Sequence, residues 1–160
     1  MTQFGHLLAL LSKSGVEFIL IGGVAAWAHG SSRATVDLDV VYERSEANLK
    51  RIADALASIH PYLRGAPPGL PFRLDLQTLR GGLNFTLTTD LGSLDLLGEI
   101  AGGGGYENLL PHSSVMTMLD ASCRCLNLDK LIEVKRAAGR PKDFEAVAEL
   151  EGMRSAGKTS

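Results

Sequence analysis

The chain has little cysteine, few aromatic residues and no excess of positive charge. Two of its 160 residues are cysteines, and aromatic side chains make up 6%. Cys123 and Cys125 stand two positions apart, so on a strand both thiols would share one face without favouring a disulfide. We interpret them as ordinary strand residues rather than half of a metal site. The net charge of −2, from 16 basic and 18 acidic residues, argues against tight binding of duplex nucleic acid but leaves room for a local basic patch.

Long hydrophobic runs are also missing. No apolar stretch approaches the roughly 20 residues that a membrane helix needs, and the N-terminus lacks the basic and apolar regions of a signal peptide. We therefore expect a cytoplasmic protein. Hydrophobic residues make up 45% of the chain, enough for a sizeable core at this length. We predict a single domain over residues 1–152 and a flexible tail over residues 153–160.

The most informative stretch of the sequence is residues 18–41. Residues 18–21 form a continuous apolar run that predicts a buried strand, and a second predicted strand, residues 35–41, carries Asp37 and Asp39. Carboxylates two positions apart on a strand point to the same face. Two neighbouring anions repel each other unless a cation lies between them, and hard oxygen ligands suit Mg²⁺.

Two glycines follow the first predicted strand directly. Gly22 and Gly23 precede an apolar segment that predicts the start of a helix. Residues without a Cβ allow close approach to the backbone, and the N–H groups at a helix start can bind phosphate. A phosphate-binding turn beside a pair of Mg²⁺-binding carboxylates favours phosphoryl or nucleotidyl transfer.

This combination resembles the signature of the DNA-polymerase-β-like nucleotidyltransferase superfamily. The signature is present as Ile21-Gly22-Gly23, a spacer over residues 24–36, and Asp37-Leu38-Asp39-Val40. Arg33 and Thr35 stand just before the acids. With them, the local sequence is most similar to small prokaryotic members akin to the abortive-infection-type (type IV) toxin nucleotidyltransferases. The alternative reading is a Gly-Gly turn followed by a surface strand with two solvated aspartates.

A third acid, Asp95, lies among leucines in a predicted strand over residues 94–97. An isolated carboxylate is costly to bury unless it is paired or bound to a metal. The resemblance implies that Asp95 is a third metal ligand and the base for an attacking hydroxyl group. The alternative is an aspartate at a strand end, in solvent.

The C-terminal part is predicted to form two helices, with Pro141 opening the second. Here the resemblance implies that Lys135 and, as a weaker candidate, Asp143 face the active cleft, with Arg140 and Lys142 beside them. A lysine there could neutralise triphosphate charge. A solvated basic helix face is the competing interpretation.

Residues 152–159 fit the Walker A pattern letter for letter. A P-loop needs a strand before the motif and a helix after it. We predict a helix before it and a tail after it, so we read the match as a coincidence.

The remaining pattern predicts a mixed α/β (α+β) fold with a short mixed sheet, helices on one face and a C-terminal helix pair that closes a cleft. Residues 60–72, rich in proline, are predicted to be a loop that faces the substrate or forms a lid. Residues 102–105, all glycine, are read as a flexible turn, although such a run could also bind phosphate. Residues 115–119 and 122–126 predict a hairpin at a sheet edge.

The resulting prediction is a Mg²⁺-dependent nucleotidyltransferase that moves an NMP from an NTP to an acceptor hydroxyl on tRNA, protein or a small molecule. It would use two Mg²⁺ ions and could serve in a toxin–antitoxin pair, with a cognate toxin or antitoxin as partner, or in phage defence. The alternatives are a non-catalytic interaction module with the same fold and a P-loop-type NTPase. The predicted metal ligands and catalytic residues are Asp37, Asp39 and Asp95. The predicted nucleotide-binding residues are Gly22, Gly23, Arg33 and Lys135.

Overall fold

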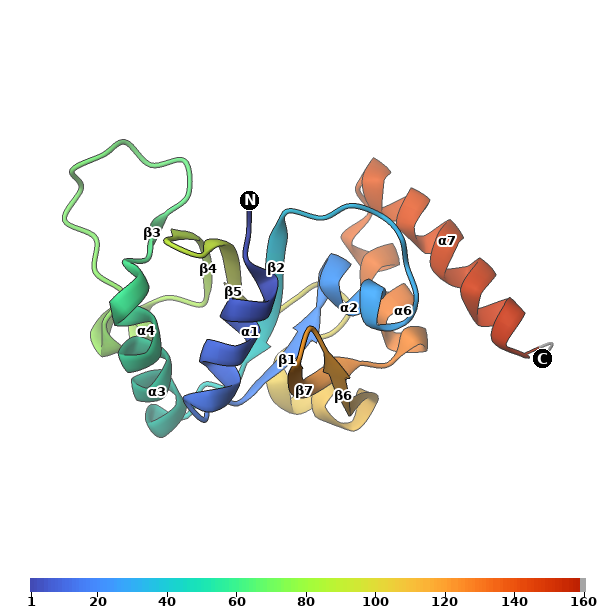
Figure 1. Cartoon of the computed structure of the whole chain (residues 1–160), viewed down its shortest axis with the longest axis horizontal. Helices are drawn as coiled ribbons and strands as arrows, with labels where there is room; N and C mark the ends of the chain where they lie inside the picture. Colours follow the sequence, from blue (N-terminus) through green and yellow to red (C-terminus); the bar gives the residue numbers. More distant parts are fainter. Residues whose placement is uncertain (159–160) are drawn as a thin grey trace.

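The computed structural model describes residues 1–158 and shows a mixed α/β fold, as the sequence predicts (Figure 1). The strands are β1 (Phe18–Ile21), β2 (Asp37–Tyr42), β3 (Tyr62–Leu63), β4 (Asn84–Thr89), β5 (Gly92–Leu97), β6 (Ser113–Met118) and β7 (Ala121–Leu126). The α-helices within these residues are α1 (Phe4–Lys13), α2 (Gly22–Ala28), α3 (Glu46–Leu56), α4 (Leu76–Gly81), α5 (Tyr106–Leu109), α6 (Leu128–Ala138) and α7 (Pro141–Lys158). Short 3₁₀ turns extend α3 (η1, Ala57–Ile59) and α5 (η2, Leu110–His112).

All the strands belong to one mixed sheet in the order β3-β4-β5-β2-β1-β7-β6. Strand β2 lies in the middle, antiparallel to β1 and parallel to β5. The β6–β7 hairpin extends the sheet on one side, with β6 at the edge, as predicted. Because β2 has a paired neighbour on each side, the acids that it carries lie at the centre of the sheet rather than at a margin.

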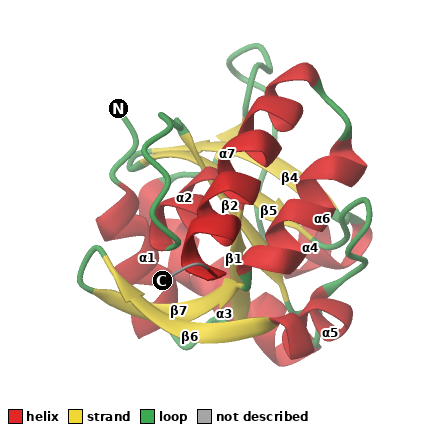
Figure 2. Ribbon diagram, turned by 90° about the vertical axis from the view of Figure 1, so that its right-hand side faces the viewer, coloured by secondary structure: helices red, strands yellow, loops and turns green. Residues whose placement is uncertain are grey.

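The two faces of β2 differ in what they contact. Leu38 and Val40 are fully buried in the hydrophobic core, whereas Asp37 and Asp39, on the opposite face, are partly accessible. Figures 1 and 2 show α1, α3 and α4 on one side of the central strands, and α2, α6 and α7 on the other, so helices cover both faces rather than the one face predicted. The alternating pattern of β2 therefore separates the core from a polar face that looks toward the C-terminal helices.

Helices α6 and α7 form the predicted C-terminal pair. Gly139 ends α6 in the left-handed conformation, with φ of 69°, and Pro141 starts α7, in agreement with the preference for glycine after a helix and proline at a helix start. The two helices pack against each other beside the polar face of β2 (Figure 2).

Two predictions about local structure need correction. Residues 60–72 are not entirely loop, because β3 pairs with β4 there. The predicted tail is helical as far as Lys158, and its last two residues lie outside the described part of the chain. Tertiary contacts explain the longer helix: Met153 packs against the core, and Arg154 forms an ion pair with Asp129.

The Walker A match falls within this helix as far as it is described. Residues 152–158 lie in α7, where a P-loop would need a turn between a strand and a helix. Among residues 1–158, no helix is both long and apolar enough to cross a membrane.

Candidate active site

The register of the central strands brings the three predicted carboxylates together. Asp39 on β2 pairs directly with Asp95 on β5, and Asp37 precedes Asp39 on the same face. All three side chains line one pocket between the sheet and α6. The structure thus brings Asp95 next to a pair of acids that lies more than fifty positions earlier in the sequence, as the resemblance implies.

Gly22 and Gly23 lie against this strand at the start of α2. A Cβ on Gly22 would collide with the carboxylate of Asp39, and one on Gly23 would lie 2.7 Å from Thr35. Gly22 also has a φ of +72°, which favours glycine. These contacts show why the turn needs residues without side chains: β2 and its acid occupy the space that a side chain would fill.

Asp39 has a strongly raised pKa. Burial, the close Asp95 carboxyl group and the charge of Asp37 raise the pKa of Asp39 to about 8, while the charge of Lys135 opposes the shift. Its Oδ1 atom is buried and has no hydrogen-bond partner among the described residues. A buried carboxylate oxygen without a partner is costly, so this atom is a ready ligand for a cation.

A basic residue that the sequence did not single out, Arg64, lies among these acids. Its guanidinium contacts Asp95 Oδ1 at 2.7 Å and Asp37 Oδ1 at 3.7 Å, and it also donates to the carbonyl oxygen of Leu87 at 2.7 Å. Arg64 directly follows β3, a two-residue strand without a clear sequence pattern. The signal that could have pointed to it is indirect: an acidic cluster needs positive charge, and Arg64 stands in a loop predicted to face the substrate.

The pocket beside the acids is one half of a larger cleft. We call this half, of about 270 Å³, the β5 lobe; Leu97, Ile100 and Leu131 add an apolar wall to it. A second pocket of about 130 Å³, the α7 lobe, lies between α7 and the segment that carries Arg33 and Thr35. The residues common to both lobes are Asp37, Asp39, Lys135, Arg140, Lys142 and Asp143.

Lys135 projects from α6 into the cleft where the lobes meet. Burial lowers its pKa, and the charges of Asp143 and Asp39 partly oppose that shift. The interpretation of Lys135 as part of a solvated basic face therefore does not hold, because the side chain is partly buried and lines both lobes.

Asp143 also reaches the cleft, but Arg140 holds it. Arg140 Nε and Nη2 donate to the two carboxylate oxygens of Asp143 at 2.6 and 3.1 Å. Burial alone would raise the pKa of Asp143, but the hydrogen bonds and charge of Arg140 outweigh it and lower the pKa. The Asp143 side chain is only 4% exposed, so this pair braces the start of α7 at the cleft wall.

Arg33 lines the α7 lobe from the segment between α2 and β2. The indole Nε1 of Trp27 donates to the carbonyl oxygen of Arg33 at 2.6 Å, which fixes the backbone of that segment. The guanidinium of Arg33 contacts Glu145 on α7 at 3.3 Å. Trp27 also packs edge-to-face on Phe4, so its ring is occupied by contacts within the fold.

The donor set suits a hard divalent cation, although the carboxylates are not arranged as a finished site. Among residues 1–158, no three Asp, Glu, His or Cys side chains form a ready metal-binding group. The free Oδ1 atom of Asp39 and the all-oxygen chemistry of Asp37, Asp39 and Asp95 fit Mg²⁺. Arg64 provides the positive charge between two of these acids instead.

Comparison with known proteins identifies the fold. The structure resembles the crystal structure of a candidate nucleotidyltransferase from Thermotoga maritima, with a TM-score of 0.56 and 12% sequence identity over 95% of this chain and 96% of that chain. No protein-family model and no curated protein sequence matches the chain. The chain therefore has a nucleotidyltransferase-like fold over nearly its whole length.

Proposed function

We propose that the protein is a Mg²⁺-dependent nucleotidyltransferase that transfers an NMP from an NTP to an acceptor hydroxyl group. The observation that carries this proposal is the β2–β5 register, which places Asp39 beside Asp95 and Asp37 in a cleft next to the glycine turn. Such a cluster of acids is costly for folding, and its free Asp39 oxygen is explained if a cation binds there.

In this reaction the acceptor oxygen forms a bond to the α-phosphorus of the NTP. The bond from that phosphorus to the oxygen bridging to the β-phosphate breaks, and pyrophosphate leaves. Asp95 is suited to take the proton of the acceptor hydroxyl, once its carboxylate is free of Arg64. Asp37, Asp39 and Asp95 would hold Mg²⁺, which when bound polarises the phosphate oxygens and offsets their charge.

The basic residues of the cleft suit the triphosphate. Lys135, Arg140 and Lys142 line both lobes, and Arg33 adds a guanidinium in the α7 lobe. Positive groups held in a partly buried cleft stabilise the charge that moves to the leaving pyrophosphate. The apolar wall of the β5 lobe suits the nucleobase.

The direct test incubates the purified protein with each of the four α-labelled NTPs, Mg²⁺ and a cell extract. We expect one NTP to label a tRNA, a protein or a small molecule, and separation of the products identifies the acceptor. The Asp39→Asn variant should lose at least a thousandfold in labelling while remaining folded. Equal labelling by the wild type and this variant would refute the proposal.

A non-catalytic module with the same fold is the second candidate, and one observation favours it. Arg64 already balances part of the negative charge of Asp95 and Asp37 without any metal ion. This candidate predicts that calorimetry detects no Mg²⁺-dependent NTP binding and that Asp39→Asn leaves the biological activity unchanged. The catalytic proposal predicts the reverse in both measurements.

A role in a toxin–antitoxin pair or in phage defence follows from the sequence resemblance to toxin-like members. The proposal predicts that expression of the wild type slows bacterial growth and that expression of Asp39→Asn does not. A cognate antitoxin gene would restore growth.

A further inference from the structure

Arg64 reaches the acids from the β3 edge of the sheet, whereas the other basic residues described above approach from the α6 and α7 side. Its backbone N–H donates to the carbonyl oxygen of Thr86 at 3.0 Å, and Thr86 pairs in register with Asp95. From this position on the β3 side, the side chain crosses β4 and ends between Asp95 and Asp37. The guanidinium therefore lies where strand pairing fixes it, next to the oxygens predicted to bind metal.

Arg64 forms a close ion pair with Asp95, but not all of its hydrogen-bond donors are used. Its contact with Asp95 is short, and these two side chains are 30% and 17% exposed. Its Nε atom, however, is buried and has no partner among the described residues. A structural arginine normally uses its donors in paired hydrogen bonds, and the unused donor lowers the cost of moving the side chain away.

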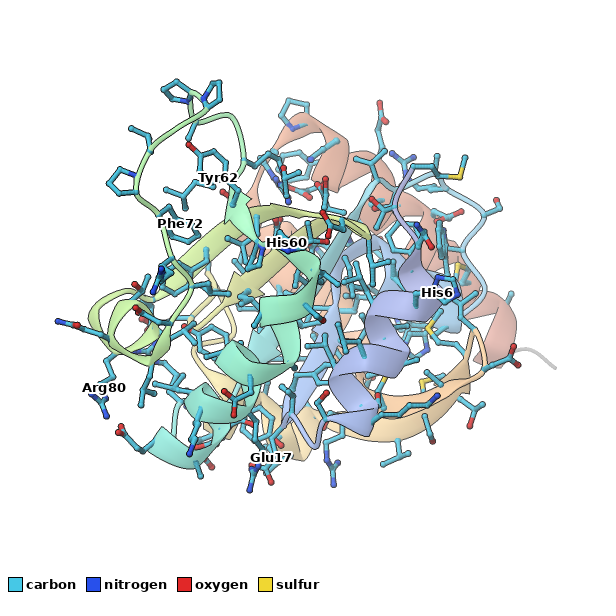
Figure 3. All side chains as sticks on the ribbon, turned by 60° about the vertical axis from the view of Figure 1, so that its left-hand side comes forward. His6, Glu17, His60, Tyr62, Phe72 and Arg80 are labelled. Carbon is cyan, nitrogen blue, oxygen red and sulfur yellow. The ribbon has the colours of Figure 1, made fainter. Side chains whose placement is uncertain are left out.

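The chain after Arg64 turns into a loop that packs little against the sheet. Gly65 follows it with a φ of +81°, and a Cβ added there would meet only open space. The loop beyond is tied at its base by Tyr62, whose hydroxyl contacts the carbonyl oxygen of Pro67 and accepts from the N–H of Leu70. Figure 1 shows the loop standing away from the rest of the fold, and Figure 3 places Tyr62 and Phe72 at its base.

We propose that Arg64 is a positioning residue that competes with divalent cations for Asp37 and Asp95, so that cation binding releases the loop after β3. This inference rests on the proposed function, because it concerns the same acids: Arg64 pairs with them before a cation binds. Two cationic groups cannot share these oxygens at close range without strong repulsion. Binding of the cation and the resting position of Arg64 therefore exclude each other.

The test measures binding of Mn²⁺ alone, followed by the loss of the free Mn²⁺ signal in electron paramagnetic resonance. Removing two charge-assisted contacts should raise the Mn²⁺ affinity of Arg64→Ala by roughly ten- to a hundredfold. Arg64→Lys keeps the charge but lacks the planar guanidinium group. The Mn²⁺ affinity of this variant should therefore lie between those of the wild type and Arg64→Ala. Arg73→Ala removes an exposed charge from the same loop and should change the affinity less than about twofold.

The outcomes separate the inference from the proposed function. If Asp39→Asn abolishes Mn²⁺ binding and Arg64→Ala leaves it unchanged or weaker, the competition is refuted while the metal site stands. If neither the wild type nor Arg64→Ala binds Mn²⁺, both the inference and the proposed function fail.

Hydrogen exchange of the wild type tests the same inference without any substitution. Hydrogen exchange should become faster over residues 65–70 when Mg²⁺ is added, because the loop loses its link to the acids. Unchanged exchange in this segment at saturating Mg²⁺ would overturn the inference.

Discussion

Replacing Asp39 by asparagine should stabilise the protein, and the gain should grow with pH. In the native state the pKa of Asp39 is about 8, mainly because of burial and the adjacent Asp95. In the unfolded chain an aspartate titrates near 3.8. Between these values the native state holds a proton that the unfolded state has lost, so stability falls as the pH rises.

The size of the effect follows from the shift. Each pH unit between the two pKa values removes about 1.4 kcal/mol from the free energy of unfolding. Between pH 5 and pH 8 the upper limit is roughly 4 kcal/mol, and we expect about 2–4 kcal/mol because the partly accessible site lets water offset some of the cost. An asparagine has no such titration and can still donate to the Asp95 carboxylate.

The assay is urea denaturation of the wild type and Asp39→Asn at pH 5, 6, 7 and 8 in the presence of EDTA. The difference in free energy of unfolding should rise steadily in favour of the variant. Asp54→Asn, an exposed acid on α3, serves as the control and should give a difference that stays within about 0.5 kcal/mol. A flat or falling difference for Asp39→Asn would refute the reasoning.

Three further substitutions and probes test the packing around the site. Gly22→Ala should lower the free energy of unfolding by about 2–3 kcal/mol and abolish NTP binding, because its Cβ would collide with Asp39 in a left-handed backbone. Arg140→Ala should cost about 1–3 kcal/mol at pH 7 by leaving buried Asp143 without its partner. This cost should shrink as the pH falls below 3.8, the ordinary aspartate value, towards the lowered pKa of Asp143. Burial raises the pKa of Cys125 to about 12, so this thiol should react with Ellman's reagent at least about a hundredfold more slowly in the native protein than in urea.

The two substitutions have matched controls in the chain. Gly81→Ala, in α4, meets open space at its Cβ and should be tolerated. Arg136→Ala removes an exposed ion pair with Glu151 and should cost less than about 1 kcal/mol. The packing arguments are wrong if Gly22→Ala is as stable as Gly81→Ala, or if Arg136→Ala costs as much as Arg140→Ala. Fast reaction of the native thiols would show that β7 opens readily.

Local patterns in the sequence predicted most of the elements that position the site. Alternation along β2 places Asp37 and Asp39 on one face, because side chains on a strand alternate over two residues. Pro141 marks the start of the last helix, in agreement with the structure. These features depend on residues a few positions apart, which is the range over which sequence patterns are informative.

Long-range pairing lies outside that range. The neighbours of Asp39 across the sheet depend on the parallel register with β5. The sequence marks Asp95 as an unusual acid among leucines, but only the family resemblance suggested that it lies beside Asp39. Arg64 depends on β3, which is two residues long and aligned through β4. The extension of α7 beyond Gly152 likewise depends on contacts with distant segments. Each of these features is a property of the assembled sheet and helices, not of any single stretch.

The same core that stabilises the fold also fixes the geometry of the site. Leu38 and Val40 are fully buried on the face of β2 opposite the acids. A slip of β2 by one residue would turn this strand over, placing Asp37 and Asp39 in the apolar layer and the leucine and valine in the cleft. Burying even one unpaired carboxylate costs several kcal/mol, so the slipped register is strongly disfavoured. The acids can therefore repel one another and remain close, because the burial of their neighbours on β2 holds the strand in place.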